Sequence, residues 1–155
     1  MTQARTYEAM GILFRFHAFP GDTMGKFCLV EAVVPPGLGA PPNHHAGETE
    51  AFYVLDGEIA FTLAGKARHV RAGGFVAVPD GAVHSFQALG QTPARILILN
   101  APGHMHEAFF TRTGKPVADA ATAPQPLDGP PDVARIVAVA AEVGMVLVPP
   151  AEAAH

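Results

Sequence analysis

Short stretches of alternating apolar and polar residues fill the chain between residues 11 and 101. Near the start of this region, Phe14 and Phe16 flank Arg15, which is the period of two that is typical of a half-buried strand. Similar stretches recur at even spacing, with turn residues between them. The pattern predicts eight or nine short strands with no helix between them, and therefore an antiparallel sandwich or a small jelly-roll barrel.

Glycine-containing turns separate these stretches. Asp56-Gly57 lies between two alternating segments at residues 51–55 and 58–63. Because an Asp-Gly pair tolerates positive φ angles, it is the strongest short-range hairpin signal. We therefore expect a hairpin at this point, and a second tight connection at Gly65.

The pattern changes after the strand-rich region. Residues 114–131 contain five prolines and little apolar periodicity, which predicts an extended strap on the surface. Asp132 can cap a following amphipathic helix that ends at Gly144, and residues 145–148 form a last apolar segment beside a sheet edge or a partner subunit. The expected organisation is a barrel, a strap, and a helix with a tail, at residues 1–113, 114–131 and 132–155.

Composition narrows the class of protein. The 155 residues are 49% hydrophobic, enough for one core and one domain, and the net charge of −4 without a basic cluster predicts no nucleic-acid partner. The most apolar run, residues 133–148, is shorter than the ~20 residues of a membrane span. Cys28 is the single cysteine, and the start of the chain has no apolar leader, so we expect a soluble cytoplasmic protein.

Metal-ligating residue types lie in two segments. Asn43 and His45 share one face of an extended strand, and Glu50 returns to that face after a four-residue bulge. His84 begins a strand after a Pro-x-Gly turn, where an antiparallel neighbour could set it against His45. Two imidazoles and a carboxylate would then meet inside the barrel, and this ligand set suits Fe(II), Mn(II), Ni(II) or Zn(II).

These two segments resemble the two sequence motifs of the cupins. The first motif falls on Gly37, Asn43, His45, Glu50 and Gly57. The second motif falls on Gly73, Pro79, Gly81, His84 and Ala88. Eight of these ten positions match. The resemblance implies an all-β fold, the cupin double-stranded β-helix or jelly-roll barrel, here with a C-terminal α-helix. Within the superfamily the chain is similar to small bacterial cupins described as quercetin 2,3-dioxygenase-like.

Two departures from the motifs bear on mechanism. Asn43 stands where the family has its first metal-binding histidine, and an amide oxygen is a poor ligand for transition metals. The expected ligands are therefore His45, Glu50 and His84, with Asn43 as a doubtful fourth contact. Alternatively, His44 turns inward as a replacement ligand, or lies beside the metal-binding residues as a supporting partner. The second departure, Ala88, replaces the asparagine that ends the second motif.

Aromatic residues are the candidate walls of a substrate pocket, because barrel pockets are mainly apolar with a few polar groups. The expected wall residues are Phe52, Phe61, Phe75, Phe86 and Met105. The segment at residues 104–110 follows the last barrel strand and could fold over the barrel mouth. Phe52 and Tyr53 alternate, so only one of them can face the interior.

The resemblance implies an enzyme with one divalent transition metal, Fe before Ni, Mn, Zn or Co. The expected activity is that of a dioxygenase on an enolic, phenolic or flavonol-like small molecule, with Glu50 as the residue that could also accept the substrate proton. Two other interpretations stay open: a non-redox isomerase, lyase or decarboxylase that uses the same metal, and a non-catalytic binding protein whose polar residues contact only each other or water. The resemblance also predicts a homodimer.

Overall fold

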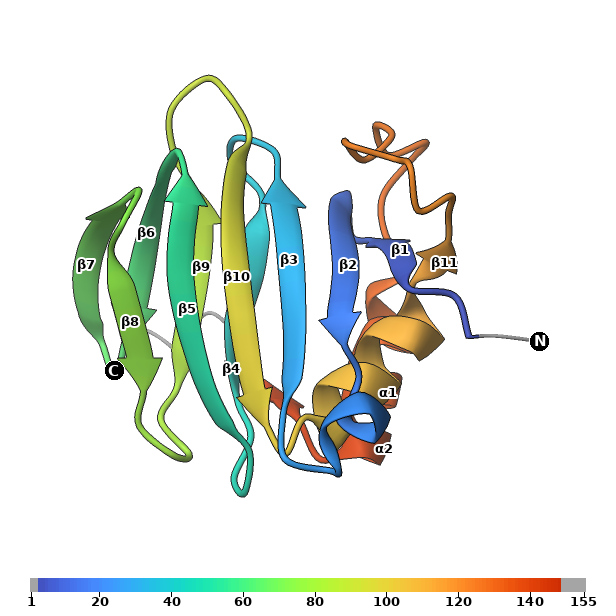
Figure 1. Ribbon diagram of the computed structural model, residues 1–155. Coiled ribbons are helices and arrows are strands. Elements are labelled where there is room, and N and C mark those ends of the chain that lie inside the picture. Colours follow the sequence, from blue (N-terminus) through green and yellow to red (C-terminus); the bar gives the residue numbers. More distant parts are fainter. Residues whose placement is uncertain (1–2, 149–155) are drawn as a thin grey trace.

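The computed structural model describes residues 3–148. Their strands form two antiparallel sheets that lie one behind the other (Figure 1). The larger sheet has the order β11-β1-β2-β3-β10-β5-β8, with bounds, in that order, of Lys115–Pro116, Thr6–Ala9, Ile12–Ala18, Cys28–Val34, Ala94–Ala101, Thr49–Asp56 and Phe75–Val78. The smaller sheet has the order β12-β4-β9-β6-β7, with bounds of Val146–Leu147, Gly39–His44, His84–Ala88, Glu58–Leu63 and Lys66–Arg71.

The alternation seen in the sequence is the alternation of side chains between the core and the outside. In β5, Phe52 and Val54 are buried whereas Tyr53 between them is exposed, so Phe52 is the one that faces the interior. The rings of Phe52 and Phe61, which come from different sheets, lie 5.0 Å apart between centroids. The nine strands β2 to β10 therefore enclose one core, as the pattern predicted.

One predicted hairpin is wrong. Gly57 has a φ of 82°, as the turn requires, but β5 on one side of it pairs with β8 and β10, whereas β6 on the other side pairs with β7 and β9. The Asp56-Gly57 turn therefore carries the chain from one sheet to the other. Each adjoining segment pairs with two other strands instead, and local turn chemistry cannot reveal this choice of partners. The expected tight connection at Gly65 does join a hairpin, β6–β7.

Two α-helices lie together beside the sandwich, near β1 and β2 (Figure 1). Helix α2, Val133–Val143, has the predicted ends: the Asp132 side chain accepts a hydrogen bond from the Arg135 backbone N–H, and Gly144 terminates the helix. Helix α1, His104–Thr113, was not predicted as a helix. Its apolar positions are too few for a clear helical period, because the buried face of the helix includes the polar residue His106 beside Phe109 and Phe110.

The proline-rich segment lies on the surface between the two helices. After the two-residue strand β11, residues 117–132 contain neither helix nor strand. Hydrogen bonds tie this segment to the larger sheet, including one from the Thr6 hydroxyl to the Asp119 carboxylate. A short 3-10 helix, η1 at Pro20–Thr23, connects β2 to β3. The last apolar segment forms β12 and pairs with the edge strand β4, as expected of a sheet-edge segment.

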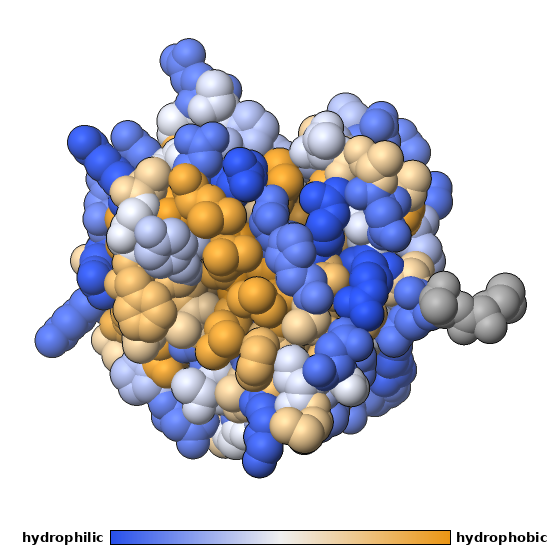
Figure 2. Space-filling view, viewed as in Figure 1, coloured by the Kyte–Doolittle hydropathy of each residue, from blue (hydrophilic) through white to orange (hydrophobic). Residues whose placement is uncertain are grey.

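The outer face of the larger sheet carries an apolar patch, which Figure 2 shows from the same direction as Figure 1. Tyr53 on β5 and Phe75 on β8 lie opposite each other there, and their side chains are 42% and 56% exposed. Leu97 and Leu99 on β10 extend the patch. Within residues 3–148, no helix is both long enough and apolar enough to cross a membrane.

Candidate metal centre

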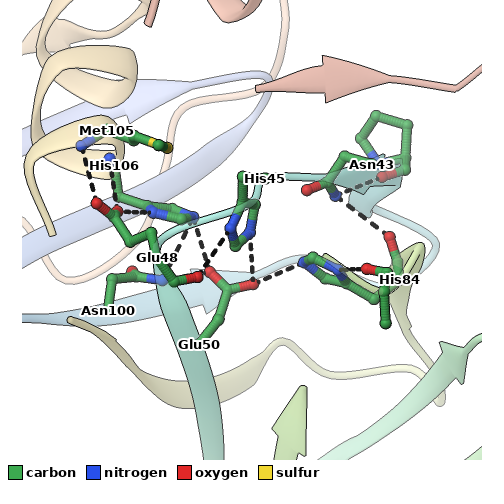
Figure 3. Close-up of polar contacts among 10 residues, drawn as sticks. Asn43, His45, Glu48, Glu50, His84, Asn100, Met105 and His106 are labelled. Carbon is green, nitrogen blue, oxygen red and sulfur yellow. Dashed lines mark hydrogen bonds and ion pairs between the residues drawn. The ribbon is translucent and has the colours of Figure 1, made fainter. Parts of the chain in front are cut away.

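Six polar side chains meet inside one end of the sandwich (Figure 3). Each of them is at most 5% exposed, which is unusual for ionisable residues unless they are paired or coordinate a metal. They are His45, Glu48, Glu50, His84, Asn100 and His106. We call these six residues the polar cluster.

Strand register brings the cluster together. Glu50 on β5 lies opposite Asn100 on β10, and Asn43 on β4 lies opposite His84, the first residue of β9. In β5, Glu50 shares its buried face with Phe52 and Val54, as the period of two requires. A carboxylate is therefore fixed at the end of an otherwise apolar inner face.

The carboxylate of Glu50 is the centre of the cluster. Its Oε1 lies 2.9 Å from His84 Nε2 and 3.8 Å from His45 Nε2, and its Oε2 lies 2.8 Å from His106 Nε2. Asn100 Nδ2 donates a hydrogen bond to Oε2. Burial alone would raise the pKa of Glu50, but the charge and hydrogen bond of His106, with a hydrogen bond from His84 and the nearby His45 ring, hold it well below its ordinary value.

Two of the imidazoles are oriented by backbone carbonyl oxygens, which lie next to Nδ1 on the side of the ring away from Glu50. His45 Nδ1 lies 3.1 Å from the Glu48 carbonyl oxygen, and His84 Nδ1 lies 2.8 Å from the Ala82 carbonyl oxygen. A carbonyl oxygen can only accept, so each Nδ1 carries a proton, and Nε2 of each ring is turned toward Glu50, with His84 Nε2 within hydrogen-bond distance of Oε1. His45 Nε2 has no hydrogen-bond partner among the described residues.

The third imidazole, His106, stands between two carboxylates. Its Nδ1 donates to Glu48 Oε1, and its Nε2 faces Glu50 Oε2. Burial would lower the pKa of His106, but these two carboxylates raise it to about 9. His106 comes from the first turn of α1, where Glu48 also accepts hydrogen bonds from the backbone N–H groups of Met105 and His106. Glu48 therefore holds both the helix end and the ring.

This donor set fits a divalent cation. The ligand atoms of His45, Glu50 and His106 lie within 4.8 Å of one another. His45 Nε2 is buried beside this carboxylate without a hydrogen-bond partner, and such an atom is costly to bury unless a donor or a positive charge lies next to it. An ion held by imidazole nitrogens and a carboxylate oxygen would supply that charge. The backbone carbonyls and Glu48 already orient the rings, as outer partners do at metal sites.

The structure brings together the three residues that the sequence predicted as ligands, and it adds others that the sequence analysis missed. The tightest group of three contains His106 in place of His84. Alternation along β10 could have found Asn100, because it shares the inner face with Ile96 and Ile98. No comparable signal identifies Glu48 or His106, since their contact joins positions 58 residues apart.

Two other predicted contacts lie outside the cluster. The side-chain nitrogen of Asn43 donates hydrogen bonds to the backbone oxygens of Pro41 and His84, at 2.9 and 3.2 Å. His44 lies opposite Val146 on β12 and is not part of the group of possible metal ligands found among the described residues. The hypothesis that His44 turns inward is therefore wrong, because strand alternation turns it away from Glu50.

A cavity adjoins the polar cluster, and the predicted wall residues divide around it. Phe52 and Phe86 line it, together with Glu50 and His106. Phe61 is buried one layer away and packs against both of those rings. The prediction for Phe75 is wrong, because the alternation along β8 places its side chain on the outer face of the sheet. Met105 does not line the cavity; Met145, next to α2, does.

Comparisons with known proteins agree with this architecture. Residues 30–100 match the sequence profile of the Cupin_2 family, described as a cupin domain. Quercetin 2,3-dioxygenase of Bacillus subtilis (strain 168) is 31% identical over 104 residues, which are 67% of this chain and 30% of that protein. An uncharacterized protein of Methanocaldococcus jannaschii is 30% identical over 82 residues, 53% of this chain and 66% of that protein. The match thus spans less than a third of the Bacillus protein.

Solved structures share the fold at low sequence identity. A predicted oxalate decarboxylase from Thermotoga maritima has a TM-score of 0.59 and 23% identity, covering 64% of this chain and 98% of that one. A polyketide cyclase from Streptomyces resistomycificus has a TM-score of 0.55 and 24% identity, covering 66% of this chain and 80% of that one. These likenesses concern the fold.

Proposed function

This chain belongs to the cupin superfamily, and from that premise we propose that it is a metal-dependent dioxygenase of an enolic or phenolic small molecule. The observation that carries the proposal is the polar cluster, and above all the buried, unpartnered Nε2 of His45 beside the carboxylate of Glu50. The partial similarity to a quercetin 2,3-dioxygenase supports the reaction class.

His45, Glu50 and His106 would hold the ion, with His84 as a fourth donor. Three imidazoles and one carboxylate suit Fe(II), and they also suit Mn, Ni, Co or Zn. When bound, the ion supplies Lewis acidity toward an enol or phenol oxygen and, as Fe(II), redox chemistry with dioxygen. Asn43 is no longer needed as a ligand, because His106 provides the imidazole that the first motif lacks.

The chain's own residues bind and orient the substrate. Glu50 and His106 face the cavity from the polar cluster, while the rest of the cavity wall is almost entirely apolar. Glu50 is ionised, and it is the group placed to accept the proton of a substrate hydroxyl. Asn100 holds Oε2 of Glu50 in place, and the apolar wall excludes water from the reacting end of the substrate.

Metal analysis of tag-free protein tests the proposal. We expect about one equivalent of a divalent transition metal, and we expect His106→Gln to weaken metal binding at least about tenfold, as loss of a ligand or its support does. His104→Gln is the matched control, because His104 lies exposed on the same helix two residues earlier. A chain that takes up none of Fe, Mn, Ni, Zn or Co would contradict the proposal and favour a binding protein.

Oxygen uptake by the Fe-loaded protein with catechol, quercetin and 1,3-diketones tests the reaction class. We expect substrate-dependent uptake that disappears in His106→Gln and persists in His104→Gln. Turnover of an enolic substrate without oxygen, with Zn in place of Fe, would instead identify a non-redox isomerase, lyase or decarboxylase.

A further inference from the structure

The cavity beside the polar cluster has two chemically distinct ends. Five aromatic rings form much of its wall: Phe14, Phe52, Phe86, Phe109 and Phe110. Ile136 of α2, with Met145 and Leu147 after it, forms another part of the wall. We call these three residues the roof. Polar side chains occur at one end, where Asn43, Glu50 and His106 face the same space.

The charges at the polar end favour an uncharged ligand. Among the described residues that line the cavity, none is a lysine or an arginine. The carboxylate of Glu50 faces the cavity and that of Glu48 lies behind His106, so an anionic ligand would meet negative charge at this end. A carboxylate or phosphate therefore gains no net attraction there and loses its hydration in an apolar space.

The size of the cavity limits the ligand to a compact molecule. Its volume is about 60 Å³, whereas pockets for drug-sized ligands are about 300–1,000 Å³ and an apolar cavity of about 150 Å³ holds benzene. The cavity is thus smaller than a benzene site, and a single ring would enter it only if flexible roof side chains such as Met145 rotate. The three rings of a flavonol need far more space than such side-chain rotations provide.

We propose that the cavity binds a compact, uncharged molecule with one apolar ring, which directs an enol or phenol hydroxyl toward Glu50 and His106. Ile136 in the roof sets the size limit. The inference rests on the proposed function for its polar end, but its apolar and size requirements belong to the cavity itself. Of the enolic, phenolic and flavonol-like molecules that the sequence resemblance suggested, the proposal therefore keeps the compact enols and phenols and leaves out the flavonols.

Ligand titration by calorimetry tests charge and size separately. The probes are catechol, benzoate and quercetin, added to protein loaded with Zn, which prevents redox turnover. We expect catechol to bind at least tenfold more tightly than benzoate, which is anionic, and than quercetin, which is too large. Tighter binding of benzoate or of quercetin would overturn the proposal.

Roof variants locate the binding site. Ile136→Phe fills the cavity and should weaken catechol binding at least tenfold at unchanged Zn content, and Ile136→Ala should tighten quercetin binding by a similar factor. Val137→Phe is the matched control, because Val137 is exposed on the same helix. If Ile136→Phe and Val137→Phe affect catechol binding equally, the cavity is not the site.

The same titrations on metal-free protein separate the two proposals. We expect weaker binding of catechol there, with the same order of the three probes. A chain that takes up no metal at all but still prefers catechol would overturn the proposed enzyme and leave the cavity inference standing. A metal-loaded chain that does not prefer catechol would overturn the cavity inference and leave the proposed enzyme standing.

Discussion

Glu48 and His106 stand 58 positions apart in the chain, yet Glu48 Oε1 lies 2.5 Å from His106 Nδ1 in the buried polar cluster. The same carboxylate accepts two backbone hydrogen bonds from the first turn of α1. A negative charge at a helix N-terminus is stabilising, and a carboxylate behind a ligating histidine fixes the orientation of its ring. One side chain thus docks the helix and aims its imidazole at Glu50.

Glu48→Gln should weaken metal binding about 10- to 100-fold while the fold is retained, because an amide orients and polarises the ring less than a carboxylate. Calorimetric titration with Zn measures the change. Glu107→Gln is the matched control, since it removes a negative charge from the first turn of α1 without touching the polar cluster. Equal affinities of wild type and Glu48→Gln would show that Glu48 acts on the helix alone.

Asn43→Ala should leave the metal affinity within about twofold of wild type. The Asn43 amide already donates to two backbone oxygens, and the imidazole of His106 takes the place of the missing motif histidine. The variant should instead lose about 1 kcal/mol of stability from its hydrogen bonds. A large loss of metal with an unchanged melting temperature would make Asn43 a ligand.

The stability of the metal-free protein should be highest between about pH 4.5 and 6.5. Glu50 and Glu48 have pKa values lowered from 4.5, so their stabilising contribution is present above that pH and is lost as the pH falls. The pKa of His106 is raised from 6.5 to about 9, so its contribution is complete below 6.5 and is lost as the pH rises through 9. Melting temperatures across this range measure the effect.

Metal binding should show the opposite trend above pH 6.5. His106 must lose a proton before Nε2 can bind an ion, so the stabilisation by added Zn should grow between pH 6.5 and 9. In His106→Gln the melting temperature of the metal-free protein should change less over this range. A stabilisation by Zn that does not depend on pH would contradict a role of protonated His106.

Gly103→Ala should destabilise the protein and weaken metal binding together. Gly103 has a φ of 96°, and an added Cβ would lie 2.3 Å from Cys28 Cβ, so α1 and His106 must shift. Gly25→Ala is the control, with a φ of 74° and no atom nearer than 4.0 Å. We expect Gly103→Ala to cost about 1–3 kcal/mol more than the control, measured by urea unfolding. If the two variants lose the same stability and bind metal equally well, the close approach of Gly103 to Cys28 does not position α1 and His106.

The predicted homodimer has a candidate interface in the apolar patch around Tyr53 and Phe75. Glu31 and Arg95 lie beside it with their side chains 3.3 Å apart, so a second copy related by a two-fold axis could exchange these opposite charges. Phe75→Glu should convert dimer to monomer in light scattering, whereas Leu127→Glu, at an exposed leucine on the strap, should not. A monomeric wild type would contradict the prediction.

The sequence by itself determined the fold class, the helix α2 and most strands of the sandwich, although it missed β1 and β11. Each of these predictions depends on interactions between residues that are close in the chain: the period of two in strands such as β2 and β5, the Asp132 cap, and the Gly144 stop. The spacing of the two motifs also placed His45, Glu50 and His84 near one another, because strand alternation and a shared fold fix where such positions point.

Only the tertiary structure decided which strands pair across Gly57, which face of the sheet Phe75 occupies, and which residues complete the polar cluster. Glu48, Asn100 and His106 come from a turn, a strand and a helix whose contacts depend on packing and register between distant segments. His106 reaches Glu50 because α1 docks on the barrel through Glu48, and no local pattern of residues records that docking.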